Sequence, residues 1–440
     1  MRVRIRRLLF TFVLCVIVLL AFPIALEAVD GVGSDPSTVR SLVSRLPHVR
    51  VPRLDAGAPT FSDAAREGVD ELLGSGDGSI VGWRYETGLW GGHIKANWWQ
   101  SALATLTLVR YAERTRSLDP RFEAVLERIY ARNIYKPRST ARQDFANEFM
   151  DDTGWWGQAW LEASRYELDV RHDLPEATRF LRVAEWDAAY INAAPRICGG
   201  IPWALNRPPD AVTSAEFITL AAGLASYLDA PGPFHDPQRA AALIRQASDA
   251  LIWLEDERLV DLRTGAVIDG LTSSCQRTGG AMTYTEGEMA DALVRLGSAL
   301  HDPVYYTYAA NFFRYALSWY SHLSVHGVLQ ERCEDRPTTC ARLGYRLDLP
   351  AFKGIFVNAV VDWTAATGSR VLIPFLRAQA TAVVDHAIRG PDGTPGDCRT
   401  PQTCQFAFNW TGRYGDRSDA VGVTLGGQES AIDALTAVLP

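Results

Sequence analysis

The sequence predicts an all-α protein in which six inner and six outer helices alternate in an (α/α)6 barrel. Three observations support this fold. Strand signals are scarce, helical periodicity recurs from about residue 60 onward, and two kinds of helical segment alternate along the chain. Repeated helical hairpins bury their apolar faces against one another, and six of them can close into a ring.

The expected outer helices have a polar face and one apolar stripe. In residues 236–254, Asp236 is placed to cap a helix, Pro237 suits its first turn, and small or aliphatic residues recur at helical spacing. The same Asp-Pro opening occurs at Asp119 and Asp302. Outer helices are therefore expected near residues 62–73, 120–133, 176–193, 237–254, 303–320 and 371–388.

The expected inner helices have few charges and are rich in Ala, Gly and aromatic residues, which is typical of helices buried on most sides. They are predicted to begin near Asn97, Asp152, Thr213, Thr283, Phe352 and Gly427. The loops before them are long and rich in Gly, Pro and Trp, whereas the loops after them are short. Because long loops usually carry function, the cleft is expected at the N-terminal ends of the inner helices.

The N-terminus has the pattern of an export signal. Four arginines among the first seven residues precede an apolar run over residues 8–26. This run is long for a cleaved signal and nearly long enough to span a bilayer, so an uncleaved membrane tether is the alternative. We expect a signal peptide or anchor over 1–28, a linker over 29–58 and the barrel over 59–440, with the barrel secreted or tethered outside the cytoplasm.

The cysteine count fits an oxidising compartment. One of the seven, Cys15, lies in the signal, and the other six form an even set. The expected pairs are Cys333 with Cys340 and Cys398 with Cys404, each close together in a polar loop, and Cys198 with Cys275, the two that remain. Other pairings stay open. Zinc is the alternative, but no His accompanies these cysteines at finger spacing. No metal or cofactor is expected.

Composition narrows the class of partner. The net charge is −7, with no Lys/Arg block beyond the first few residues, which disfavours nucleic acid. The chain has 13 Trp, 15 Tyr and 17 Phe. Most of these belong in a core, but carbohydrate-binding clefts also use Trp, because an indole face can cover the apolar face of a sugar ring.

Residues 148–160, EFMDDTGWWGQAW, place two adjacent aspartates at the start of the second inner helix. One interpretation is structural, because Asp is a favoured N-cap and acids suit the first turn. The other is catalytic. At a helix start the backbone is still turning, so the carboxylates of both Asp151 and Asp152 can reach one cleft.

Glycoside hydrolysis is the chemistry that uses two carboxylates in this way. One attacks the anomeric carbon or directs water to it, and the other protonates the leaving oxygen. Two close carboxylates cannot both ionise freely, so one keeps its proton nearer neutral pH. The helix N-terminus favours the ionised partner.

Five motifs then occur in the order found in one known family: DDTGWWGQAWLEA, CGGIPW, VIDG, TYTEGEM and FKGIFV. From about residue 80 to the C-terminus the chain resembles glycoside hydrolase family 76, which comprises (α/α)6-barrel endo-α-1,6-mannanases and related fungal cell-wall transglycosidases. The resemblance implies that Asp151 is the nucleophile of a retaining reaction and that Asp152 is the general acid/base.

The chain departs from the family pattern at three places. The family usually has Tyr-Asn-Gln-Gly where this chain has Tyr-Thr-Glu-Gly at 284–287, and it often has an Asn where this chain has residues 213–216. It often has an Arg where this chain has Asn358. All three places are expected near the cleft, so they leave subsite preference and linkage open.

Further residues are candidates for substrate binding. One Trp of each adjacent pair could stack on a sugar while its neighbour packs in the core, and Trp203, beside the CGG motif, could line the cleft. Glu286 could bind sugar hydroxyls or simply favour a helix start, and Lys353 could pair with the aspartates, contact sugar or form a structural ion pair. The full set is Trp98, Trp99, Trp155, Trp156, Trp203, Tyr284, Glu286 and Lys353.

Taken together, these features predict a retaining glycoside hydrolase that cleaves α-1,6-linked α-mannan, in endo fashion and as a monomer. One alternative is a transglycosidase, in which an acceptor sugar replaces water. Another is a non-catalytic carbohydrate-binding barrel whose aspartates only cap a helix.

Overall fold

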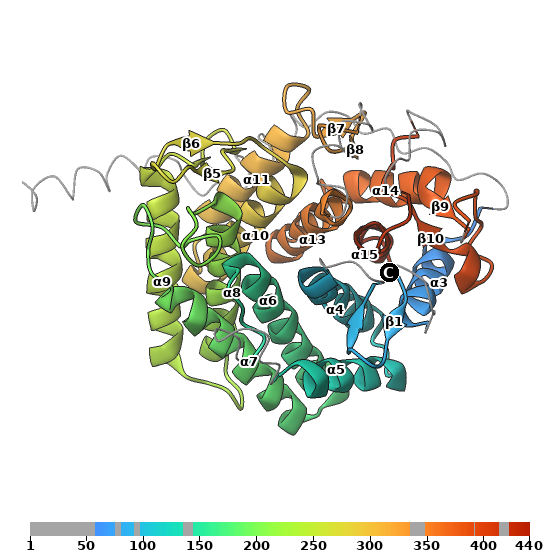
Figure 1. Cartoon of the computed structure of the whole chain (residues 1–440), viewed down its shortest axis with the longest axis horizontal. Helices are drawn as coiled ribbons and strands as arrows, with labels where there is room; N and C mark the ends of the chain where they lie inside the picture. Colours follow the sequence, from blue (N-terminus) through green and yellow to red (C-terminus); the bar gives the residue numbers. More distant parts are fainter. Residues whose placement is uncertain are drawn as a thin grey trace, which may run out of the picture. The chain divides into compact units, whose positions relative to one another are not determined.

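The computed structural model describes residues 58–74, 81–91, 97–134, 144–334, 348–390, 392–412 and 422–440, which form the expected helical ring (Figure 1). The expected signal or anchor and the linker lie outside the described residues, apart from position 58.

Six inner helices follow one another around the ring in the described part of the chain, and the last packs beside the first. They are α4 (Asn97–Thr115), α6 (Met150–Tyr166), α8 (Ala211–Asp229), α10 (Thr283–Leu300), α13 (Leu349–Thr367) and α15 (Leu425–Thr436). Each inner helix is preceded along the chain by an outer one. The outer helices are α3 (Phe61–Leu73), α5 (Pro120–Asn133), α7 (Leu174–Ala193), α9 (Pro237–Asp256), α11 (Val304–Ala316) and α14 (Ile373–Ala382). The (α/α)6 prediction is confirmed.

The helix starts follow the capping chemistry of the sequence. At α9, Asp236 accepts a hydrogen bond from the Arg239 amide, as expected. Four inner helices begin earlier than predicted, α6, α8 and α15 by two residues and α13 by three. At α8 and α15 the reason is a cap just upstream that the sequence analysis overlooked. The carboxylate of Asp210 accepts from the Thr213 amide at 2.8 Å, and the hydroxyl of Thr424 accepts from the Gly427 amide at 3.1 Å.

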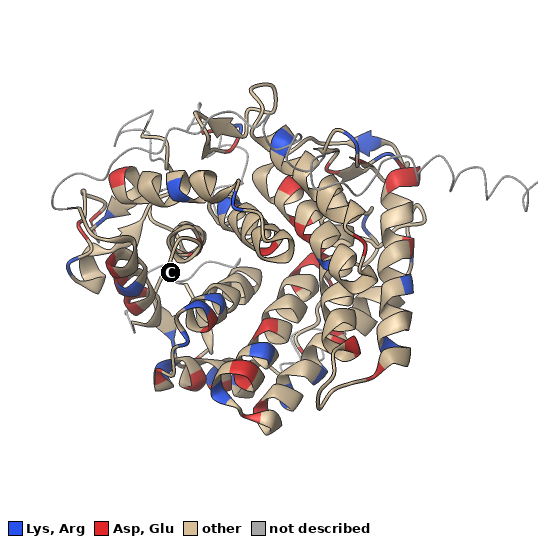
Figure 2. Ribbon diagram, turned by 180° about the vertical axis from the view of Figure 1, so that it is seen from behind, with Lys and Arg blue, Asp and Glu red and all other residues tan. Residues whose placement is uncertain are grey.

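Burial separates the two rings. Helix α8 is buried almost continuously from Ala211 to Ala225. By length and composition it is the one helix in the described residues that could cross a membrane, but 89% of the qualifying stretch is buried inside the barrel, as in any apolar core helix. The outer helices carry charges of both signs without a block of one sign (Figure 2), as expected for a solvated face.

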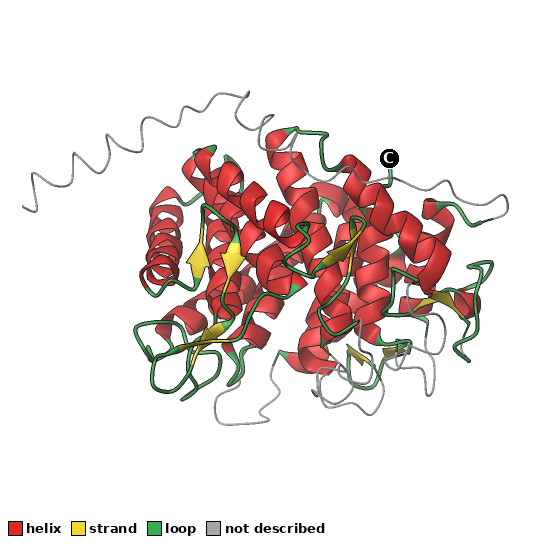
Figure 3. Cartoon of the chain, turned by 90° about the horizontal axis from the view of Figure 1, so that it is seen from above, coloured by secondary structure: helices red, strands yellow, loops and turns green. Residues whose placement is uncertain are grey.

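Short antiparallel hairpins decorate the loops between helices (Figure 3). Each strand has two residues: β1 (Trp83–Arg84) pairs with β2 (Leu89–Trp90), β3 (Val260–Asp261) with β4 (Ala266–Val267), β5 (Gly270–Leu271) with β6 (Arg277–Thr278), β7 (Ser324–Val325) with β8 (Val328–Leu329), and β9 (Ile388–Arg389) with β10 (Gln405–Phe406). All five lie in segments that run from an outer to an inner helix, which stiffens the end of the barrel where the inner helices begin.

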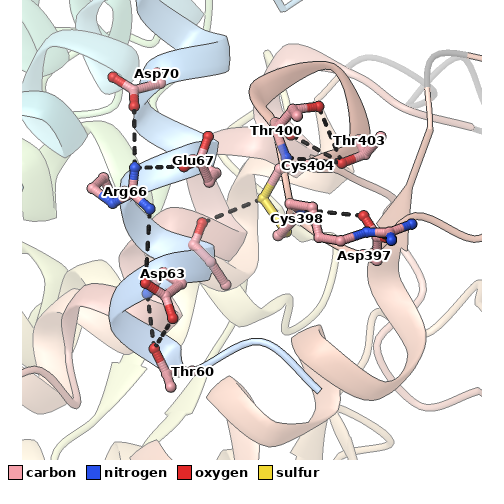
Figure 4. Close-up of polar contacts among 12 residues, drawn as sticks. Thr60, Asp63, Arg66, Glu67, Asp70, Asp397, Cys398, Thr400, Thr403 and Cys404 are labelled. Carbon is pink, nitrogen blue, oxygen red and sulfur yellow. Dashed lines mark hydrogen bonds and ion pairs between the residues drawn. A yellow bond between two sulfur atoms is a disulfide. The ribbon is translucent and has the colours of Figure 1, made fainter. Parts of the chain in front are cut away.

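Two of the expected disulfides are present. Cys198 bonds Cys275 across 77 residues, and Cys398 bonds Cys404. The second lies against α3, where the Cys404 sulfur contacts the Ala64 carbonyl (Figure 4). Cys333 is disulfide-bonded, and its expected partner, Cys340, lies outside the described residues.

Candidate active site

The aspartate pair lies in the first turn of α6 but does not cap it. The N-cap is Phe149, which is extended and makes no side-chain cap. Asp151 and Asp152 are both half-buried and sit at the end of the barrel where the long loops gather. The cap interpretation therefore does not account for the pair.

Asp151 is held at both of its carboxylate oxygens. The indole nitrogen of Trp203 donates to Oδ2 at 2.7 Å, and the Asp152 amide donates to Oδ1 at 2.9 Å. Burial and the neighbouring Asp152 charge raise the pKa of Asp151 to about 8, although the Trp203 hydrogen bond lowers it. The pair therefore holds one proton over a wide pH range.

Asp152 is oriented by Asn147, a residue that the sequence analysis missed. The Asn147 amide nitrogen donates to Asp152 Oδ2 at 2.7 Å. Asn147 is fully buried, and its own oxygen accepts from the Phe149 amide at 2.8 Å. Its backbone amide also donates to the Thr153 hydroxyl at 3.2 Å. An amide clamped in this way fixes the position of one Asp152 oxygen.

The loop before α8 brings Trp203 to the pair. The Met150 amide donates to the Trp203 carbonyl, and the Leu205 amide donates to the Glu148 carbonyl, both at 2.8 Å. The Trp203 ring meets Phe149 edge to face with centroids 5.3 Å apart. Because 38% of Trp203 remains exposed, its ring has area available for a ligand. That Trp203 lines a substrate cleft stays a prediction.

Two further carboxyls, Asp210 and Glu216, interact with the Asp151 charge, and a third, Asp269, interacts with Asp210. Burial, followed by the Asp151 charge, raises the pKa of Asp210 to about 8, and burial raises the pKa of Asp269 to about 6. Burial and the same Asp151 charge hold the pKa of Glu216 well above its usual range. In the described residues, no Lys or Arg forms an ion pair with Asp151, Asp210, Asp269 or Glu216.

Asp269 and Asp210 come together through backbone contacts. The Ala211 amide donates to the Asp269 carbonyl at 2.6 Å, and Asp210 bridges Gly270 of β5. The sequence analysis did not include Asp210 or Asp269 among its candidate site residues. The signal that could have singled them out is their position in the long loops before inner helices, with Asp210 as the N-cap of α8.

Glu216 lies beneath the pair and is completely buried. Neither of its oxygens has a hydrogen-bond partner among the described residues. A Cβ added at Gly154 would lie 2.6 Å from Glu216 Oε2. Gly154, two residues after Asp152, has no side chain and therefore leaves room for this carboxyl. A buried carboxyl without a partner is stable only when it is neutral.

The two predicted Trp pairs behave differently from each other. At the start of α4, Trp99 is half-buried, while Trp98 packs against Phe145 and Trp156 with centroids 5.9 and 5.1 Å apart. In α6, Trp156 is fully buried, and Trp155 faces a cavity of about 20 Å³ inside the barrel. Of these four rings, Trp99 alone keeps appreciable solvent exposure.

Tyr284 joins the cluster of carboxyls, whereas Glu286 and Lys353 point elsewhere. The half-buried Tyr284 stacks on Phe352 at 3.9 Å, and burial together with Asp269 and Asp210 holds its pKa above the usual range. Glu286 is buried and accepts from the Thr285 hydroxyl at 2.6 Å. Lys353 is also buried.

The contacts of Lys353 are those of a structural ion pair. Its Nζ lies 2.6 Å from Glu334 Oε1 and donates to the Phe408 carbonyl at 2.7 Å. It also lies 4.4 Å from the Phe408 ring centroid. This favours the structural role weighed for Lys353 over a contact with the aspartates or with sugar. Within the described ranges, no group of three or more His, Cys, Asp or Glu has a geometry that could hold a metal ion.

Comparison with known proteins agrees with this geometry. The family model described as "Glycosyl hydrolase family 76" matches residues 82–439. The chain belongs to glycosyl hydrolase family 76. This membership makes it a glycoside hydrolase and confirms the resemblance found in the sequence. No curated protein shows a significant sequence match to the chain.

Several solved structures share the fold. An inactive α-1,6-mannanase variant, GH76A of Salegentibacter sp. HEL1_6 in complex with α-1,6-mannotriose, is 18% identical with a TM-score of 0.60, and the match covers 86% of this chain and 97% of that one. Dfg5 from Chaetomium thermophilum, in complex with glucosamine, is 19% identical with a TM-score of 0.66, covering 89% and 92%. The family 76 mannosidase Bt3792 of Bacteroides thetaiotaomicron is 12% identical with a TM-score of 0.55, covering 86% and 97%.

Proposed function

We propose that this glycoside hydrolase cleaves α-1,6-mannosidic bonds within an α-mannan chain and retains the anomeric configuration. The single observation that carries the proposal is the paired first-turn carboxyls of Asp151 and Asp152, with a partly exposed indole beside them. The structurally similar Salegentibacter α-1,6-mannanase binds α-1,6-mannotriose in a variant inactivated at two consecutive aspartates. This chain contains one Asp-Asp pair, and it lies at this site.

The mechanism is a double displacement. Asp151 attacks the anomeric carbon and forms a mannosyl ester, while the bond to the leaving sugar breaks and Asp152 gives its proton to the departing oxygen. Asp152, now ionised, then takes a proton from water as that water attacks the same carbon. The ester breaks, and both carboxyls return to their starting states. Adjacent positions suit the short carboxyl separation that retention requires.

These roles require the single proton of the pair to reside on Asp152, although burial raises the pKa of Asp151. In the active form Asp151 is ionised and Asp152 is protonated. Two N–H groups point at the Asp151 oxygens, and such donors stabilise a carboxylate. The carboxyls around the pair, Asp210 and Glu216, have raised pKa values, so they add little negative charge near neutral pH.

The test is to incubate the protein with linear α-1,6-mannan and size the products over time. Oligosaccharides of intermediate length are expected early, before mannose accumulates. Mannose alone from the first time point would contradict internal cleavage, and no product at any pH from 4 to 8 would overturn the substrate assignment. An α-1,4-glucan of similar length serves as the control polymer and is expected to remain intact.

We also propose that the enzyme acts as a monomer outside the cytoplasm, exported or tethered through residues 1–28. The two disulfides support this, because such bonds persist in oxidising compartments. An exported enzyme would also meet a cell-envelope polysaccharide directly. Fractionation of cells that express the full chain checks the location, and exclusively cytosolic protein would contradict it.

A further inference from the structure

We propose that Trp203 is a positioning residue for the reaction, because its indole N–H holds the Asp151 carboxyl in place for attack. This inference rests on the proposed function, since it assumes that Asp151 is the nucleophile. It assigns to Trp203 a role beyond that of a sugar platform. The indole N–H would orient the Asp151 carboxyl, and the exposed indole face would contact the sugar.

The geometry fixes Asp151 at two points. Trp203 Nε1 lies 2.7 Å from Oδ2, and the Asp152 amide nitrogen lies 2.9 Å from Oδ1. The second donor belongs to the helix backbone and cannot be removed by changing a side chain. Trp203 is therefore the side chain that sets the rotation of the Asp151 carboxyl, and with it the oxygen that faces the substrate.

The backbone around Trp203 is held independently of its ring. Its amide donates to the Pro208 carbonyl at 3.2 Å, and its carbonyl accepts from the Met150 amide at 2.8 Å. Ala204 bridges Phe149, and the Cys198–Cys275 disulfide anchors the start of the same loop. Replacing the ring is therefore expected to remove the N–H donor without displacing the loop.

The hydrogen bond also favours the ionised form of Asp151. Burial and the Asp152 charge raise the pKa of Asp151, and the Trp203 hydrogen bond opposes that rise. Without the N–H donor this lowering effect is lost, and Asp151 keeps its proton to a higher pH. Double displacement requires an ionised nucleophile, so a larger fraction of the enzyme would be in the unreactive form.

The experiment compares Trp203→Phe with Trp186→Phe on α-1,6-mannan oligosaccharides. Trp186, on outer helix α7, is 40% exposed and so is a matched control. Phe keeps an aromatic face but has no N–H donor. We expect kcat for Trp203→Phe to fall about 10- to 100-fold, as for loss of a hydrogen bond to a charged group, with KM within about threefold. The acidic limb of the pH–rate profile should move up by about one pH unit, and Trp186→Phe should match wild type.

Trp203→His provides a rescue, because the Nε2–H of a flipped imidazole occupies nearly the position of the indole N–H. It should recover part of kcat and return the acidic limb to the wild-type position or below. This variant also keeps the proposal testable if Trp203→Phe proves unstable in a melting experiment.

Three outcomes separate the possibilities. Unchanged kcat and an unshifted limb in Trp203→Phe, with an inactive Asp151→Asn, would overturn the positioning role and leave the proposed function standing. A lower kcat with an unshifted limb would also overturn it, because a platform or structural role would account for that result. An active Asp151→Asn would instead refute the proposed mechanism itself.

Discussion

Carboxyls are buried at both ends of the barrel, but the pKa values of Asp151 at one end and Asp362 at the other are shifted in opposite directions. At the end where the inner helices begin, Asp151 and Asp210 have pKa values raised to about 8. Toward the other end, Arg110 and Arg295 lie 2.9 and 2.7 Å from Asp362, and these cations hold its pKa well below the usual range against the opposing effect of burial. Arg295 also reaches Glu162 at 3.0 Å.

The difference lies in the presence of a cation at close range. Glu162, beside Arg165 and Arg295, has a lowered pKa. Asp291, whose contact with Arg295 is longer at 3.6 Å, keeps a pKa raised to about 8 because burial outweighs that contact. Carboxyls paired directly with arginine fasten the inner helices together. Carboxyls without such a partner cost stability and can exchange protons with a substrate.

The largest expected effect comes from Asp151→Asn and Asp152→Asn. Each should reduce kcat on α-1,6-mannan by about 1,000-fold or more, because the nucleophile or the acid is lost. The stability of the fold, in contrast to activity, should increase for Asp151→Asn at pH 8. An acid whose folded-state pKa is raised above its unfolded value binds more protons when folded, so it loses stability as pH rises from about 4 to 8.

Asn has no charge to bury, so Asp151→Asn should melt about 1–3 °C above wild type at pH 8 and show little difference at pH 4. Thermal melts at the two pH values check this. A variant that melts well below wild type at pH 8 would show that Asp151 stabilises the fold, and the contrast between the two ends would fail.

A substitution at the opposite end of the barrel should lower the free energy of unfolding. Asp362→Asn removes the carboxylate that pairs with Arg110 and one of the carboxylates that pair with Arg295, and breaking a buried pair costs about 3–5 kcal/mol. Denaturant unfolding of Asp362→Asn checks this. The control is Asp397→Asn, which breaks an exposed pair with Arg399 and should cost no more than about 1 kcal/mol. Equal losses in the two variants would show that the buried network contributes nothing special.

Activity should depend on pH through the catalytic pair. The active form carries one proton, so turnover should fall above about pH 8, the raised pKa of Asp151, as the pair loses that proton. The decline should approach tenfold per pH unit. A pH–rate profile on a mannan oligosaccharide measures it, and activity that keeps rising beyond pH 9 would contradict a shared proton.

A smaller effect is expected at Gly154→Ala. The new methyl group would lie 2.6 Å from Glu216 Oε2, and overpacking of this kind costs about 1–3 kcal/mol, partly offset by the better helix propensity of Ala. Gly232→Ala is the matched control, because nothing lies within 4 Å of the added atom. Equal melting temperatures for the two variants would indicate that Glu216 moves aside freely.

Much of the fold was predictable because its signals are local. Alternating charged and apolar helices, Asp-Pro openings and long loops before inner helices required only the order of residues. The pair at Asp151 and Asp152 was also visible, because the two residues are adjacent. Asn147 and Glu216 could not be found in this way, since their roles depend on contacts across the turn before α6 and between α6 and α8.

Burial also could not be judged from residue type alone. Lys353 has a helix-start position that suggested a contact with sugar or with the aspartates, but Glu334, distant from the cleft motifs in the sequence, supplies its counter-charge. Trp156 is a residue type that often forms a sugar platform, but here it lies among other aromatic rings in the core. Both side chains had to be placed in three dimensions before their partners were known.

The central claim is that Asp151 becomes covalently bonded to the sugar. Incubation with a 2-deoxy-2-fluoro-mannosyl fluoride, followed by mass spectrometry of the intact protein and its peptides, measures this directly. The account predicts one added fluoromannosyl group on Asp151 in wild type and none in Asp151→Asn. An adduct on Asp210 or another carboxyl, or no adduct from enzyme that hydrolyses α-1,6-mannan, would contradict it.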